Sequence, residues 1–254
     1  MNHRRQALAR ITAAALTLAA IPSLAMAASM REQLDALING PKGTLNVVLV
    51  DTTGSIAQED WQLYERAMQA LIDSAKPGDR IVMAAVHDRP GSRFLAHADH
   101  SFCAEGNSMQ QAVRARRTRE AMRTDLVALR SAHSRPALAT LLIDAVSATG
   151  ELFAQGRARG QALRLLVLSD MLEEGPTANF ARGEVTPALA ERVIERQRRR
   201  TLLPDLAGVR VRVVGASGRD AAHMASVRGF WQSFFAASGA QVEAYGRTAG
   251  ALAH

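Results

Sequence analysis

The feature that most constrains the fold is a short, almost uninterrupted apolar run from Leu45 to Val50. It is rich in β-branched residues and lacks a regular polar alternation, which is typical of a strand covered on both faces. A helical apolar stripe follows from Tyr64 to Ala75, and Ile81 to Val86 forms a second apolar run. A strand, a helix and a strand within this length favour a right-handed crossover between parallel strands.

The same alternation continues along the chain. We expect further strands at 163–168, 209–214 and 241–245, and helices at 108–132, from the break at 133–136 to about 154, and from Thr186-Pro187 to Arg200. Residues 87–107 are expected to form an irregular excursion with a possible short edge strand near Phe94 and Leu95. The pattern predicts an α/β fold, a doubly wound, mostly parallel sheet with helices on both faces.

One later segment has an aromatic face at helical spacing. Val227, Phe230, Trp231, Phe234 and Phe235 lie on that face before Gly239 ends the helix. Aromatic residues at this spacing are more often core than a partner site, so we expect the face to be buried.

The N-terminus has the pattern of a secretory signal peptide. Arginines at positions 4, 5 and 10 precede an apolar stretch that ends in Ala25-Met26-Ala27, a plausible cleavage site. We therefore expect residues 1–27 to be removed and the mature chain to be periplasmic or secreted, with an uncleaved anchor as the alternative. Residues 28–43 would be an N-terminal segment, 44–246 one domain and 247–254 a tail. No transmembrane segment is expected in the mature chain.

The net charge is modest. The formal charge of +7 includes three signal-peptide arginines, so the mature chain is nearer 7 − 3 = +4. The arginine clusters at 114–123 and 196–200 have no aromatic residues interleaved, so they are expected to be solvated helix faces and nucleic-acid binding is not expected. A single cysteine, Cys103, excludes an intrachain disulfide.

Polar residues at two strand ends predict a metal site. Asp51, Thr53 and Ser55 follow the first strand, with Gly54 allowing a sharp turn, and Asp170 follows the strand at 163–168. Ligands collect at the carboxyl ends of parallel strands. These hard oxygen donors favour Mg²⁺, with Mn²⁺ or Ca²⁺ possible.

The sequence also predicts roles for several residues near these proposed ligands. Ser55 and Gln58 have the spacing of a capping box, so Ser55 could serve as helix cap and ligand. The acidic residues Asp144, Glu173 and Glu174 are expected to face solvent.

The motif resembles the metal-ion-dependent adhesion site of von Willebrand factor A domains. That family has Asp-x-Ser-x-Ser followed by a distant Thr and a distant Asp, and here the pattern is Asp51-x-Thr53-x-Ser55, Thr140 and Asp170, within a resemblance covering 45–245. It implies that the hydroxyls contact the metal and that the carboxylates act directly or through water. It also implies an open position for a carboxylate from a protein partner. Ser134 could replace Thr140 if the next helix begins at Pro136.

Three functions follow from these observations. The first is an exported binding module that holds a divalent cation and recognises an acidic partner. The second rests on another resemblance, because residues 51–55 are similar to the phosphorylation motif of haloacid-dehalogenase-type phosphotransferases. It implies a phosphohydrolase with Asp51 as nucleophile, although Thr53 stands where such enzymes place a general acid. The third is a scaffold without metal function. Because no arrangement of nucleophile, base and oxyanion donors is visible, the chain is not expected to be an enzyme.

Overall fold

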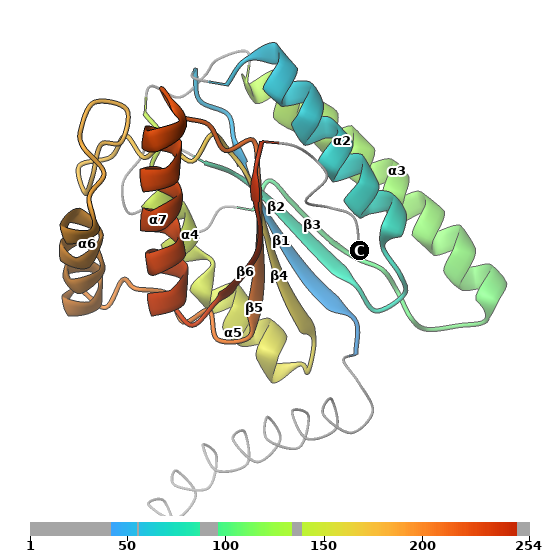
Figure 1. Ribbon diagram of the computed structural model, residues 1–254. Helices are drawn as coiled ribbons and strands as arrows, with labels where there is room; N and C mark the ends of the chain where they lie inside the picture. Colours follow the sequence, from blue (N-terminus) through green and yellow to red (C-terminus); the bar gives the residue numbers. More distant parts are fainter. Residues whose placement is uncertain (1–41, 55, 87–95, 134–138, 248–254) are drawn as a thin grey trace, which may run out of the picture.

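A six-stranded sheet forms the centre of the molecule (Figure 1). The computed structural model describes residues 42–54, 56–86, 96–133 and 139–247. The strand order is β3-β2-β1-β4-β5-β6, and only β3 pairs antiparallel with its neighbour. The strands are β1 Thr44–Asp51, β2 Arg80–Val86, β3 Ala98–Ser101, β4 Ala162–Leu168, β5 Val209–Val214 and β6 Gln241–Gly246.

Helices cover both faces of this sheet. They are α2 Gln58–Ser74, α3 Ser108–His133, α4 Leu142–Ala148, α5 Gly150–Ala158, α6 Pro187–Arg199 and α7 Ala221–Ala237. The helices α2 and α3 lie on one face, and α4 to α7 lie on the other (Figure 1). The predicted α/β class with a mostly parallel, doubly wound sheet is therefore confirmed.

The alternation of side chains along β1 explains the continuous apolar run in the sequence. Val47 and Leu49 join the core beneath α4 to α7, whereas Val48 and Val50 join the core beneath α2 and α3. Successive strand residues point to opposite faces, so a strand covered twice needs apolar residues at nearly every position.

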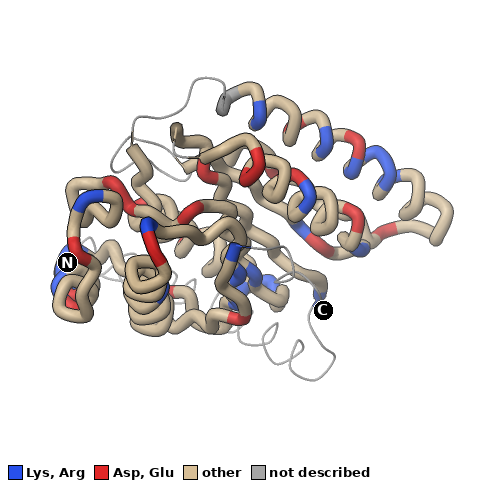
Figure 2. Tube along the Cα trace, turned by 45° about the horizontal axis from the view of Figure 1, so that its top comes forward, with Lys and Arg blue, Asp and Glu red and all other residues tan. Residues whose placement is uncertain are grey.

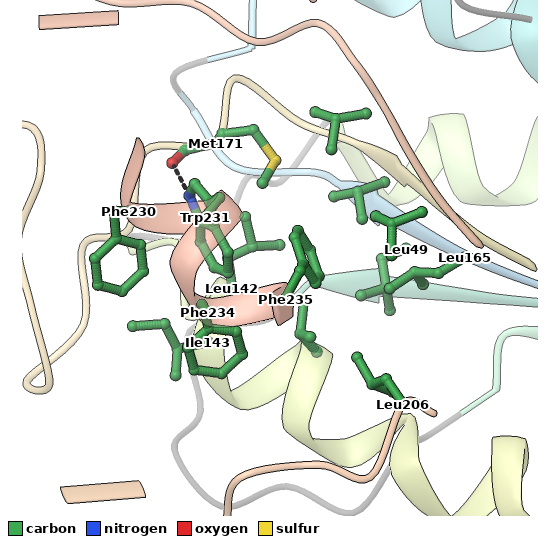
Figure 3. Packing of buried hydrophobic residues seen from close by; sticks show 14 of the residues in the cluster. Leu49, Leu142, Ile143, Leu165, Met171, Leu206, Phe230, Trp231, Phe234 and Phe235 are labelled. Atoms are coloured by element: carbon green, nitrogen blue, oxygen red, sulfur yellow. Dashed lines mark hydrogen bonds between the residues drawn. The ribbon is translucent and has the colours of Figure 1, made fainter. Parts of the chain in front are cut away.

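The aromatic face of α7 is buried as predicted. Phe230, Trp231, Phe234 and Phe235 are each at most 2% exposed, and their rings pack against one another above Leu142 and Ile143 of α4 (Figure 3). This cluster fixes α7 and α4 relative to the strands. It matters for the site because Trp231 also contacts the loop that follows β4.

Most arginines of α3 that have partners contact α2. Arg123 pairs with Asp73, and Arg130 pairs with Glu65. Arg119 donates to the carbonyl oxygens of Ile72 and Ala75 at the end of α2. These contacts join two neighbouring helices that both carry basic and acidic positions (Figure 2).

Local details differ from the sequence predictions. The 87–107 segment contains the edge strand β3, later than expected, while Phe94 and Leu95 lie outside the described residues. The predicted cap of α2 is wrong: α2 begins at Gln58 with Ala57 as N-cap and no side-chain cap bond. The predicted helix start at Thr186-Pro187 is confirmed, since Thr186 is the N-cap of α6 and its hydroxyl oxygen accepts from Leu189 N at 3.2 Å.

Several predictions concern residues that the structure does not describe. The signal peptide at 1–27, most of the 28–43 segment, Ser55, Ser134 and the tail from 248 onward all lie outside the described residues. Within the described part of the chain, no helix combines the length and apolar character needed to cross a membrane.

Candidate metal centre

The site lies where the direction of the sheet winding changes. β1 pairs in parallel with β2 on one side and with β4 on the other. The connection after β1 runs through α2 on one face, and the connection after β4 runs through α6 on the opposite face (Figure 1). The carboxyl ends of β1 and β4 thus flank a topological switch point, the usual place for a ligand in an open parallel sheet.

Asp51 is the centre of a buried hydrogen-bond network at this edge. Its side chain is fully buried. Oδ1 accepts hydrogen bonds from Thr53 N at 3.0 Å and from the Thr53 hydroxyl at 2.6 Å. Oδ2 accepts from the Ser169 hydroxyl at 2.8 Å. The carboxylate is therefore held in one orientation by both strand-end loops.

Thr140 joins this network from a distant part of the sequence. Its hydroxyl donates to Thr53 Oγ1 at 3.0 Å, although the two residues are 87 positions apart. It lies in the loop before α4 rather than inside a helix, and its carbonyl oxygen accepts from Glu174 N at 2.8 Å. The three side chains of Asp51, Thr53 and Thr140 form one continuous chain of oxygen atoms.

Asp170 follows directly after the serine that contacts Asp51. It is 7% exposed, and its Oδ1 accepts from Leu172 N at 2.9 Å. Its carbonyl oxygen accepts from Ser217 N at 3.0 Å, which connects the loop to the segment after β5. Asp170 is thus positioned at the same edge as the other three predicted ligands. Ser55, the fifth, lies outside the described residues.

The backbone after Asp170 takes an unusual conformation. Met171 has φ of 69°, the left-handed region, which costs a non-glycine residue about 1–2 kcal/mol. Two hydrogen bonds hold it there: Met171 N donates to Ser169 Oγ at 2.9 Å, and Trp231 Nε1 donates to the Met171 carbonyl oxygen at 2.9 Å (Figure 3). The aromatic cluster of α7 therefore fixes the loop that presents Asp170.

Tyr64 of α2 brings a polar atom beside the site. The side chain is 1% exposed, and within the described residues its hydroxyl has no hydrogen-bond partner. Burial raises the pKa of this hydroxyl strongly, and the charges of Asp51 and Asp170 raise it further. Gly215 leaves room for the ring, because a Cβ there would lie 2.6 Å from the Tyr64 hydroxyl oxygen. A buried hydroxyl without a partner is unfavourable unless a water or ligand completes it.

The burial of Glu173 differs from the sequence prediction. We expected it to face solvent, but it is 1% exposed. It accepts hydrogen bonds from Ile143 N at 2.8 Å and Gly175 N at 3.1 Å, so it joins the loop after β4 to the first turn of α4. Burial raises the pKa of Glu173 to about 8, against the lowering effect of its backbone hydrogen bonds. Asp144 and Glu174 are half-buried.

Sequence reasoning did not identify Ser169, Tyr64 or Glu173. Ser169 carried a signal, since it sits directly between the strand and Asp170. Tyr64 belongs to an ordinary apolar stripe, and Glu173 is one acid in an acidic pair, so nothing local distinguishes either. Tyr64 and Glu173 come close to the site because α2 and α4 pack against the sheet.

The donor set suits a hard cation. The donor groups are two carboxylates and two hydroxyls, from Asp51, Asp170, Thr53 and Thr140, and the buried Tyr64 hydroxyl lies close enough to feel both carboxylate charges. Such oxygen donors match Mg²⁺, Mn²⁺ or Ca²⁺. Across the described ranges, no three side chains of His, Cys, Asp or Glu are grouped to hold a metal.

Comparison with known proteins adds no assignment. No family model matches the chain, and a search of curated proteins finds no match.

Proposed function

We propose that this chain is a binding module of the von Willebrand factor A type, which holds a divalent cation at the carboxyl edge of β1 and β4. The ligands would be Asp51, Thr53, Ser55, Thr140 and Asp170, and Mg²⁺ would be the first choice of metal, with Mn²⁺ or Ca²⁺ as substitutes. The observation that carries the proposal is the bond between the hydroxyls of Thr140 and Thr53, at 3.0 Å. It joins two of the three predicted loops.

The chemistry of the site supports recognition. Where Asp51 and Asp170 act through water, the direct protein ligands are neutral hydroxyls, and the cation keeps much of its positive charge because only directly bound charged ligands reduce it appreciably. Mg²⁺ also retains bound waters that a stronger ligand can displace. The proposed ligand is an Asp or Glu side chain of a protein partner, whose carboxylate would occupy one such position and bridge the two chains through the metal.

The surroundings of Asp51 favour a holding role over a nucleophilic one. Its side chain is fully buried, and both carboxylate oxygens accept hydrogen bonds. A carboxylate whose lone pairs are engaged by donors is a weaker nucleophile and must break those bonds to attack. A phosphohydrolase that uses Asp51 stays the alternative. It would release phosphate from an aryl phosphate, and Asp51→Asn would abolish that release.

Export is a separate part of the proposal. It depends on residues 1–27 and would place the partner in the periplasm or outside the cell. N-terminal sequencing of the protein purified from its native host tests it. A mature chain beginning near Ala28 supports export, and a chain that retains residues 1–27 in the soluble cytoplasmic fraction contradicts it.

Electron paramagnetic resonance of Mn²⁺ tests the metal and the partner chemistry together. We expect the protein to reduce the free Mn²⁺ signal, and Mg²⁺ in excess to restore it. Thr53→Val should lose this effect, because it removes a hydroxyl ligand with little change in shape. Thr124→Val, an exposed position on α3, is the matched control and should bind as the unsubstituted protein does.

The same experiment examines the open coordination position. A short peptide containing one Glu should alter the spectrum of the bound Mn²⁺, and the same peptide with Gln should not. If Mn²⁺ binds equally to the unsubstituted protein and Thr53→Val, the proposed site is wrong. If the Glu and Gln peptides act alike on bound Mn²⁺, the metal binds but the proposed carboxylate recognition is wrong.

A further inference from the structure

A basic groove lies on the α2 face of the sheet, toward the amino ends of β1, β4 and β5. Its volume is about 550 Å³. The last turns of α2 form one wall with Leu71 and Ser74, and Asn46, Arg164 and Arg210 line the strand side. The candidate metal centre lies at the opposite, carboxyl ends of the same strands, so the two sites are separate.

The strands change character along this face. Toward their carboxyl ends, the side chains under α2 are apolar, as with Val48, Leu166 and Val214. Toward their amino ends, the positions of the same parity are Asn46 in β1, Arg164 in β4, and Arg210 and Arg212 in β5. In Figure 2 several basic positions lie close together near the middle of the view. Parallel sheets normally bury such faces, so this polar half is an exception that packing does not require.

The arginines are placed in an unfavourable arrangement for the protein alone. Arg164 lies directly opposite Arg210 in the register of β4 and β5. Like charges on facing strand positions destabilise a sheet. Glu243 of β6 is the acid beside them: it accepts from Arg212 Nε at 2.9 Å and from Arg210 Nη1 at 3.3 Å. One carboxylate therefore serves a group of three guanidinium ions.

The charges that line the groove do not balance. Lys76, Arg164, Arg210 and Arg212 are basic and Asp79 and Glu243 are acidic, which leaves 4 − 2 = +2. Asp79 is already engaged, since its carboxylate accepts from Thr44 N at 2.7 Å and from Lys76 N at 2.8 Å. Within the described residues, the side chains of Arg164 and Lys76 have no hydrogen bond or ion pair. These two cations are available to a ligand.

We propose that this groove binds a small organic dianion, with phosphate or carboxylate oxygens on Arg164 and Arg210 and an apolar part against Leu71 and Leu166. Guanidinium groups bind both kinds of oxyanion through paired hydrogen bonds. The volume lies in the range of small-molecule sites, roughly 300–1,000 Å³, and the mixed apolar and polar lining is typical of them. The charge excess selects a dianion over a monoanion.

Nuclear magnetic resonance titration of the ¹⁵N-labelled full chain locates such a ligand. The probes are phenyl phosphate and phthalate, two small aromatic dianions, with neutral benzyl alcohol as control, all at constant ionic strength. The buffer contains chelator, so the outcome does not depend on the metal centre. We expect saturable shifts of amides around Ala70, Leu71 and Leu165 with at least one dianion, and none there with benzyl alcohol. The stronger of the two dianions identifies the oxyanion.

Variants separate a site from general charge attraction. Arg164→Gln should weaken binding about tenfold, the effect of one lost charge-assisted pair. Arg192→Gln makes the same charge change at an exposed position of α6 and should leave the affinity unchanged. Because the Arg164 side chain makes no hydrogen bond or close ion pair in the described part of the chain, its replacement should not unfold the protein, and circular dichroism checks this. Arg210→Gln provides a second test in the groove.

Three results would overturn the proposal. The first is an absence of saturable shifts with both dianions. The second is an equal loss of affinity in Arg164→Gln and Arg192→Gln, which would indicate attraction to net charge. The third is equally tight binding of benzyl alcohol at the same amides, which would indicate an apolar pocket in which the arginines take no part.

Discussion

Replacing Thr140 by valine removes one hydroxyl from the buried network and changes little else. The side chain is 1% exposed, and its hydroxyl donates to Thr53 Oγ1 at 3.0 Å. Thr53 in turn donates to Asp51 Oδ1 at 2.6 Å. Valine has nearly the shape of threonine, so the cost comes from the lost hydrogen bond and, in the presence of a cation, from the lost ligand.

The two costs can be separated with a chelator. Without metal, a buried hydrogen bond contributes about 1 kcal/mol to the free energy of unfolding, which is the expected loss. With Mg²⁺ at a hundred times its Kd, binding adds about 2.7 kcal/mol to the stability of the unsubstituted protein. If the variant binds Mg²⁺ tenfold more weakly, its gain falls to about 1.4 kcal/mol by the same relation. The difference between the two proteins then grows from about 1 to about 2.3 kcal/mol.

Urea unfolding in chelator and in Mg²⁺ measures both differences, with Thr140→Ser as the control that keeps the hydroxyl. With a typical slope near 2 kcal/mol per molar urea, the midpoints should differ by roughly 0.5 M in chelator and by about twice that in Mg²⁺. A stabilisation by Mg²⁺ that is the same in Thr140→Val and the unsubstituted protein would refute a role for Thr140 as a metal ligand.

Three further substitutions give distinct results. Trp231→Phe leaves the Met171 carbonyl without its donor and should lower the free energy of unfolding by about 1–3 kcal/mol in urea unfolding; an unchanged midpoint would contradict this. Tyr64→Phe removes a buried hydroxyl with no partner in the described chain and should stabilise the metal-free protein by about 1 kcal/mol while weakening Mg²⁺ binding; destabilisation in chelator would contradict it. The Glu173 pKa is raised to about 8, so between its unfolded value near 4.5 and pH 8 the native state binds more protons and stability should fall as pH rises. Glu173→Gln should remove that slope, measured as thermal midpoint against pH, and an equal slope in both proteins would be inconsistent with this assignment.

The fold was predictable because the strands carry a strong local signal. The strand at 45–50 is buried on both faces, so its residues are apolar at nearly every position. The helix is buried on one face only, so its apolar residues recur at helical spacing along 64–75. Both patterns can be seen in the sequence. The exact residues at which helices begin were less predictable. Ser55 and Gln58 have the spacing of a capping box, yet α2 starts with Ala57 as N-cap, so a local cap worth about 1 kcal/mol does not decide where this helix begins.

The site was predictable only in part, because some of its residues are placed by strand order and others by the packing of helices and loops. Strand-end residues such as Asp51 and Asp170 occupy positions that topology brings to one edge, so their approach follows from the strand order. Tyr64 and Glu173 reach the site from α2 and from a loop, and their burial depends on how those segments pack. The basic groove also follows from the parity of strand positions, which becomes informative only once the face covered by α2 is known.

Isothermal titration of the purified chain with Mg²⁺ tests the central proposal most directly. The account predicts a saturable isotherm with one equivalent of metal per chain. It also predicts that Asp51→Asn and Asp170→Asn lose this isotherm while circular dichroism shows that both remain folded. An absence of binding to the unsubstituted protein, or an unchanged isotherm in both folded variants, would contradict the proposal that these strand-end residues hold a cation.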